Sequence, residues 1–104
     1  MRGENMKSED RQRKFQASPN YIHRQVAGQH MLISVGEGIA DFNGYIQLNE
    51  TASFIWDQLK EPRSLPELTA ALSAEYEIST EQAAEDVNDF VSELEKQKMV
   101  TIYE

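Results

Sequence analysis

The sequence contains no cysteine and no long apolar segment. Without cysteine, the chain can form neither disulfides nor thiolate-ligated zinc sites or iron–sulfur clusters. The N-terminal stretch is polar and lacks the apolar run of a signal peptide, and no other stretch has the length of a membrane span. We therefore expect a cytoplasmic protein with no membrane partner.

Catalytic motifs are missing as well. The sequence has no HExxH zinc motif, no Gly-x-Ser-x-Gly nucleophile motif and no glycine-rich phosphate loop after a predicted strand. His23 and His30 lie on neighbouring predicted strands, and we interpret them as isolated surface residues. Glu81, Glu85 and Asp89 recur every four positions of a predicted helix, a spacing that could hold a cation but is more typical of a solvated face. We expect neither enzymatic activity nor a metal or cofactor.

Basic residues are scarce: 10 Lys and Arg stand against 18 Asp and Glu, for a net charge of −8. Residues 1–15 hold five basic and three acidic residues, whereas the remaining chain holds five basic and fifteen acidic residues. A folded part with this excess of negative charge repels the phosphate backbone. Nucleic acid is therefore not an expected partner.

The length of 104 residues and the hydrophobic content of 39% fit one small domain with a modest core. Residues 1–18 are polar and charged, and Phe15 is their only aromatic residue. Such a stretch buries too little apolar surface to offset the entropy of ordering it. We interpret residues 1–18 as a disordered charged arm and residues 19–104 as the folded domain.

Three strands are predicted in the first half of this domain. Residues 21–26 form the first strand, and Ala27-Gly28 makes a turn. Residues 29–35 form the second strand, because apolar side chains recur there with a period of two. Residues 39–42 could extend the pairing, and Asn43-Gly44 is a strong signal for a type I′ hairpin turn.

The third strand covers residues 45–48. Because side chains alternate along a strand, Ile46 and Leu48 should point inward and leave Tyr45 and Gln47 on the other face. Asn49 follows at once and can cap a helix with its side-chain oxygen. The strand therefore turns directly into a helix.

Three helices follow. The first covers residues 50–60 and buries Trp56 as the largest single part of the core. The second begins with a capping box, Ser64 with Glu67. The third runs from residue 79 or 80 to about residue 98, with Gln82 placed for a second capping box, and residues 99–103 could add a terminal strand. This order predicts an α+β domain: a three-stranded antiparallel sheet followed by a three-helix bundle that resembles a winged helix.

Two kinds of binding site fit this arrangement. The third helix of a winged helix-turn-helix reads DNA, but residues 79–98 carry six acidic and two basic residues, the opposite of what a DNA groove requires. A third strand at the sheet edge could instead accept a peptide as an added strand, beside one flank of the apolar stripe on the third helix. The stripe could also be core along its whole width.

The run DFNGYIQLNETA, residues 41–52, with Ile55 and Trp56 behind it, resembles the PqqD-like family. The spacing of apolar residues in both later helices is similar to the family pattern too, and the resemblance covers residues 21–103. It implies a RiPP recognition element, a domain that binds the leader segment of a ribosomally made precursor peptide. Such a domain presents the precursor to a modifying enzyme, for example a radical S-adenosylmethionine enzyme or a leader peptidase.

The resemblance also implies where the leader binds, as a strand added to the third β-strand and covered by the third helix. The implied contacts on the strand and on the helix are Tyr45, Ile46, Gln47 and Leu48, and Ala83, Asp86, Val87, Phe90 and Glu93. The negative charge implies a leader with basic or mostly apolar anchors. The alternative function is a winged-helix regulatory module that binds another protein or DNA.

Overall fold

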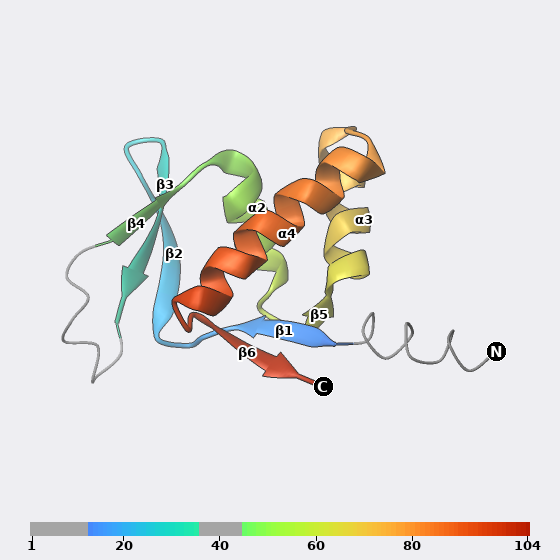
Figure 1. The fold of residues 1–104 in the computed structure, drawn as a ribbon. Coiled ribbons are helices and arrows are strands. Elements are labelled where there is room, and N and C mark those ends of the chain that lie inside the picture. Colours follow the sequence, from blue (N-terminus) through green and yellow to red (C-terminus); the bar gives the residue numbers. More distant parts are fainter. Residues whose placement is uncertain (1–12, 36–44) are drawn as a thin grey trace.

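The computed structural model describes residues 13–35 and 45–104. Figure 1 shows the strands β2, β3 and β4 at one end and α3 toward the other, with α4 running diagonally between them and β1 and β6 below. The elements, with the labels of Figure 1, are β1 (Lys14–Ala17), β2 (Tyr21–Val26), β3 (Gln29–Ser34), β4 (Tyr45–Leu48), α2 (Glu50–Gln58), β5 (Arg63–Ser64), α3 (Leu65–Tyr76), α4 (Thr80–Lys96) and β6 (Val100–Tyr103).

The three strands expected first in the domain are confirmed, and they form one antiparallel sheet in the order β2-β3-β4. Ala27 and Gly28 join β2 to β3 with φ angles of 54° and 79°. Positive φ at both central residues is the mark of a type I′ turn, whose twist matches that of the flanking strands. The expected extension at residues 39–42 and the Asn43-Gly44 turn lie outside the described residues.

The strand β1 differs from the expected disordered arm. Phe15 is only 1% exposed, and β1 pairs with β6 on one side and with β5 on the other. Burial of one aromatic ring, together with backbone pairing on both sides, offsets the entropy of ordering this short stretch. Residues 14–17 therefore belong to the fold, whereas residues 1–12 lie outside the described part.

The terminal strand expected at residues 99–103 is confirmed as β6, but it does not join the first sheet. It forms a second antiparallel sheet with the order β5-β1-β6. The described residues thus form two three-stranded sheets, where the sequence predicted one. The α+β class is confirmed, and the likeness of the helices to a winged helix stays a prediction.

The helix α2 begins where predicted. The Asn49 side chain accepts a hydrogen bond from the amide of Ala52 at 2.8 Å, so the cap follows β4 without an intervening loop. The capping box of α3 is also present: Ser64 Oγ accepts from the Glu67 amide at 3.3 Å, and Glu67 Oε1 accepts from the Ser64 amide at 2.9 Å.

The second predicted capping box is only half formed. Ser79 Oγ accepts from the Gln82 amide at 3.0 Å, but the Gln82 side chain donates to Asp86 one turn later. Both α2 and α4 end two residues before the predicted positions, at Gln58 and Lys96.

The core lies between the helices and the two sheets. Trp56 is 3% exposed, as expected of its large apolar side chain, and Leu32 and Phe15 bring the two sheets into the same apolar cluster. The rings of Phe54 on α2 and Tyr76 on α3 meet edge to face, with centroids 5.7 Å apart. Among the described residues, no helix combines the length and apolar character that crossing a bilayer requires.

The burial of Phe15 yields a stability prediction. We expect Phe15→Ala to lower the free energy of unfolding by about 3–5 kcal/mol, because it leaves a cavity where β1 meets the core. Urea unfolding measures this change. Val35→Ala, at a side chain that is 53% exposed, is the control and should change stability by less than about 0.5 kcal/mol. Equal effects of both substitutions would contradict the assignment of β1 to the fold.

The capping box yields a pH prediction. The hydrogen bond from the Ser64 amide, with the nearby charges of Lys14 and Arg63, lowers the pKa of Glu67 from its ordinary value of 4.5, against the opposing effect of burial. A carboxyl with a lowered pKa stabilises the fold above its unfolded pKa, and this contribution disappears as the pH falls through the folded pKa.

Glu67→Gln keeps an oxygen acceptor at this position but cannot titrate. We expect this substitution to lower the free energy of unfolding at neutral pH. In acid, below the pKa of Glu67, the free energies of unfolding of the parent and the variant should differ less. Urea unfolding from neutral to acidic pH measures both. A difference that does not change with pH would contradict the role of the Glu67 charge.

Candidate peptide-binding site

The strand β4 lies at the edge of its sheet. Among the described residues it pairs with β3 alone, with Leu48 opposite His30 and Ile46 opposite Leu32. An edge strand exposes backbone donors and acceptors that can pair with another chain. The edge position that strand addition requires of residues 45–48 is therefore present among the described residues.

The register shows which backbone groups face outward. The Val35 amide donates to the Asn20 carbonyl at 2.7 Å, and hydrogen-bonded pairs alternate along an antiparallel ladder. The pairs Ile22–Ile33 and Arg24–Met31 are thus hydrogen-bonded, so β3 directs the backbone groups of its other residues toward β4. On β4, Ile46 and Leu48 face β3, and the amide and carbonyl of Gln47 point away from the sheet.

A hollow of about 290 Å³ begins where β4 ends and continues along α4. We call it the Phe90 hollow. It is lined by Asn49, Thr51, Ala52, Ile55, Asp86, Asp89 and Phe90. Thr51, Ala52 and Ile55 belong to the first two turns of α2, which begins at the Asn49 cap. The three lining residues of α4 are spaced three or four positions apart and so lie on one face of that helix. An open strand edge and a partly apolar hollow thus adjoin each other.

The expected site residues on β4 lie as the alternation predicts. Ile46 is half-buried and Leu48 is 7% exposed. Gln47 is exposed, and its side-chain amide donates a hydrogen bond to Gln29 Oε1 on the neighbouring strand β3. Tyr45 contributes its backbone to β4, and its side chain lies outside the described part.

The expected site residues on α4 separate into two groups. Asp86 and Phe90 are half-buried and line the Phe90 hollow, and Glu93 is exposed about one turn further along. Ala83 and Val87 are 0% exposed and belong to the core. In this arrangement the two side chains have no exposed surface, and their contact with a peptide stays a prediction. The flank that faces the hollow is the one that carries Phe90.

Sequence reasoning did not assign five of the residues that line the Phe90 hollow, namely Asn49, Thr51, Ala52, Ile55 and Asp89. The signal that could have found four of them was the strand-to-helix joint. A helix that starts directly after the edge strand has its first two turns close to the end of that strand. Asp89 could have been found from its position next to Phe90, on the polar border of the apolar stripe.

Residues 29–100 match the family described as coenzyme PQQ synthesis protein D, PqqD. The matched part is well over half of the chain and contains β4, α2, α3 and α4. The chain belongs to the PqqD family. The strands β1 and β2 precede the matched residues, and no protein with a curated description matches the chain.

One solved structure with a similar fold is TbiB1 in complex with the TbiA(beta) leader peptide. The TM-score is 0.65 at 22% sequence identity, and the likeness covers 86% of this chain and 98% of the other. The PqqD-family fold described above is therefore shared with that structure over most of both chains.

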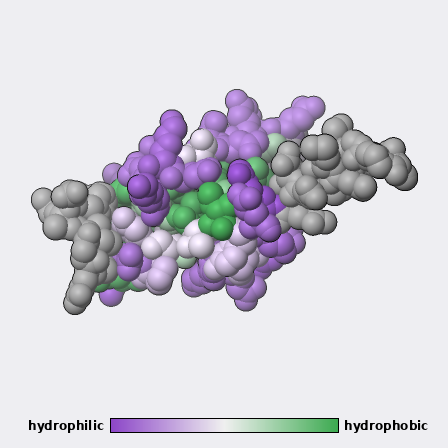
Figure 2. All heavy atoms as spheres, turned by 60° about the horizontal axis from the view of Figure 1, so that its bottom comes forward, coloured by the Kyte–Doolittle hydropathy of each residue, from purple (hydrophilic) through white to green (hydrophobic). Residues whose placement is uncertain are grey.

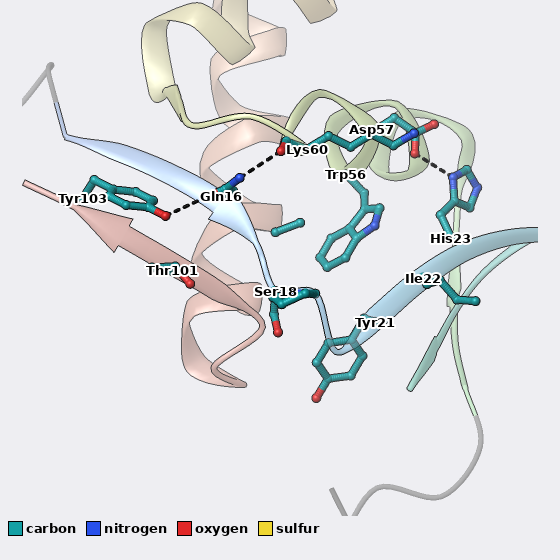
Figure 3. Close-up of a pocket in the computed structure, with 12 residues that line it drawn as sticks. Gln16, Ser18, Tyr21, Ile22, His23, Trp56, Asp57, Lys60, Thr101 and Tyr103 are labelled. Atoms are coloured by element: carbon teal, nitrogen blue, oxygen red, sulfur yellow. Dashed lines mark hydrogen bonds and ion pairs between the residues drawn. The ribbon is translucent and has the colours of Figure 1, made fainter. Parts of the chain in front are cut away.

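A second hollow, of about 770 Å³, lies on a different part of this PqqD-family domain (Figure 3). We call it the Trp56 hollow. Trp56 and Asp57 of α2 and Lys60 just after it form one wall, and residues of β1, β2 and β6 contribute to the others. Gln16 lies at its side, where it donates to the Lys60 carbonyl at 3.0 Å and accepts from the Tyr103 hydroxyl at 2.7 Å.

Figure 2 brings the side of β1 and β6 forward and shows apolar surface at the centre of this face, with hydrophilic side chains around it. Sequence reasoning missed the Trp56 hollow because it depends on β1, a strand that was not predicted. Its lining combines polar side chains, such as those of Gln16 and His23, with apolar ones, such as those of Ile22 and Trp56.

From the sequence we interpreted the two histidines as isolated surface residues. In the structure both make side-chain contacts. His23 Nδ1 lies 2.8 Å from Asp57 Oδ1, and His23 Nε2 lies 2.9 Å from His30 Nδ1. These contacts connect α2, β2 and β3. Within the two described ranges, no three His, Cys, Asp or Glu side chains come together as a possible metal site.

Proposed function

We propose that this PqqD-family chain is a cytoplasmic, non-catalytic domain that binds the leader of a ribosomally made precursor peptide by β-strand addition. It then presents the precursor to a modifying enzyme. The observation that carries the proposal is the edge strand β4, which adjoins a partly apolar hollow formed by Phe90 and the start of α2. Family membership and the fold shared with TbiB1 support it.

The energetics require both parts of the site. Each backbone hydrogen bond between a guest strand and β4 contributes about 1 kcal/mol net. The four residues of β4 direct only part of their backbone groups outward. A micromolar complex requires about 8 kcal/mol. Backbone pairing alone therefore falls short, and side chains seated in the Phe90 hollow supply the remaining affinity and the specificity.

The proposed partners are the precursor peptide and one modifying enzyme, either a radical S-adenosylmethionine enzyme or a leader peptidase. The proposed contacts are the backbone of Tyr45 and Gln47, the side chains of Ile46 and Leu48 where they reach the edge, and Asp86, Phe90 and Glu93. Ala83 and Val87 are buried in the core cluster against which Phe90 packs.

The alternative, a winged-helix module that binds DNA, has the charge of α4 against it. Five acidic residues, Glu81, Glu85, Asp89, Glu93 and Glu95, are exposed on this helix. A gel-shift assay at low salt tests the alternative, because groove binding requires basic contacts that salt weakens. Tight, salt-sensitive binding of DNA would overturn the peptide proposal as the main function.

The outward backbone of Gln47 allows a direct test of strand addition. We expect Gln47→Pro to weaken binding about tenfold or more, because proline removes the outward N–H and its ring obstructs a neighbouring strand. Proline is tolerated there because that N–H is not used by the sheet. The probe is a peptide selected for binding from a displayed random library, and fluorescence anisotropy measures its Kd.

Gln47→Ala is the matched control, since it removes the side-chain contact with Gln29 but keeps the backbone N–H. We expect its Kd to stay within about twofold of the parent value. If the proline variant binds the peptide as tightly as the alanine variant does, the guest does not pair with β4.

The position of Phe90 allows a second test. We expect Phe90→Ala to raise the Kd of the same peptide about tenfold, because a buried apolar anchor contributes about 1.5 kcal/mol or more to binding. Circular dichroism and thermal unfolding should still show a folded domain. Val91→Ala, at a 3% exposed core position, should instead lower the free energy of unfolding. The molecules that remain folded should bind the peptide as tightly as the parent chain does. Loss of folding in Phe90→Ala would show that Phe90 is a core residue and not a site residue.

A further inference from the structure

The Phe90 hollow combines an apolar interior with acidic side chains at its border. Ile55 is 1% exposed, and Ala52 and Phe90 are half-buried, so the interior is apolar. Asp86 and Asp89 lie at the border on α4. The remaining lining residues, Asn49 and Thr51, are uncharged, and no basic side chain lines the hollow.

The two carboxylates have no cationic partner among the described residues. The ion pairs found in the described part of the chain join Lys14 to Glu67, Arg63 to Glu61 and His23 to Asp57, and none of them includes Asp86 or Asp89. Asp86 accepts a hydrogen bond from the uncharged Gln82 side chain at 3.0 Å. Like charges three positions apart on one helix face repel each other, so a cation placed between them would be stabilised.

One basic side chain, that of Arg13, lies outside the hollow in a depression that Asp89 also lines. Arg13 lines a separate depression together with Asp89 and Glu95, and its guanidinium lies over the Phe15 ring, 5.2 Å from the centroid. Arg13 therefore leaves the side of Asp89 and Asp86 that faces the hollow without a positive charge. The charge of the site is complementary to a basic guest.

We propose that the guest strand anchors in the Phe90 hollow through one lysine or arginine side chain. This inference rests on the proposed function, because it assumes that a peptide strand lies along β4. The methylene stem packs on the half-buried Phe90 and Ala52, and the charged head reaches Asp86 and Asp89. Long basic side chains suit such a site because they bury an apolar stem while the head stays hydrated.

Arginine fits the site in two further ways. Its planar guanidinium can bind carboxylate oxygens in pairs, and it can lie over the face of an aromatic ring such as Phe90. The anchor has a defined place in the guest strand as well. Because the hollow begins at Asn49, the basic residue belongs to the end of the guest that lies beside Leu48 and Asn49.

A displayed library of random short peptides tests the proposal, with the full chain as the target. The test variant carries Asp86→Lys and Asp89→Lys. The matched control carries Glu75→Lys and Glu77→Lys, which change the net charge by the same amount. These control positions are exposed, lie at the C-terminal end of α3 where lysine is favourable, and do not line the Phe90 hollow.

We expect peptides selected by the parent chain to share one basic position, and peptides selected by the test variant to carry Asp or Glu there. The control should select basic residues as the parent does. Replacing the basic residue of a selected peptide by glutamine should weaken binding about fivefold at low salt, and less at high salt, as for a partly exposed ion pair. If the lysine variant fails to fold, Asp86→Asn with Asp89→Asn replaces it and should abolish the basic preference.

The outcomes separate the two proposals. Peptides without a shared basic position, or a preference that the test variant leaves unchanged, overturn the basic anchor. If binding of those peptides is still weakened by Gln47→Pro, strand addition to β4 stands without it. A basic preference lost equally in the control shows only a response to net charge and also overturns the anchor. If no selected peptide responds to Gln47→Pro, the proposed function fails, and the anchor fails with it.

Discussion

The hydrogen bond from the Ala52 amide to the Asn49 side chain is the interaction on which the site depends. It starts α2 directly after the last residue of β4, so no loop separates the edge strand from the helix. A longer connection would allow the strand and the hollow to move apart. The cap therefore fixes the distance between the backbone groups that can pair with a guest and the side chains that can select it.

The second sheet holds this joint in place from the other side of the core. Its strands come from distant parts of the chain: β1 precedes the first hairpin, β5 precedes α3, and β6 follows α4. Phe15 and Met99, each 1% exposed, connect these strands to the same apolar cluster that contains Trp56 and Leu59. Both sheets and the three helices thus share one apolar core.

Local patterns predicted the elements that local physics determines. The period of two predicted β3, the same alternation predicted the inward side chains of β4, and the Ser64–Glu67 capping box located the start of α3. A strand at residues 21–26 and a turn at Ala27-Gly28 were expected as well. Tertiary pairing decided the rest. Phe15 stands in a charged stretch, and its pairing partners lie far along the chain, so no local pattern indicated β1. Helical periodicity gave the apolar stripe of α4 but not the depth of each side chain, so it did not separate the buried Ala83 and Val87 from the half-buried Phe90.

The most direct measurement of the central claim is amide hydrogen exchange, residue by residue, with and without a bound library-selected peptide. We predict that the peptide slows exchange at the outward amide of Gln47, whereas Ile46 and Leu48, which already face β3, change little. Protection that appears instead on the opposite edge strand β2 or on β6, with Gln47 unchanged, would contradict strand addition at β4.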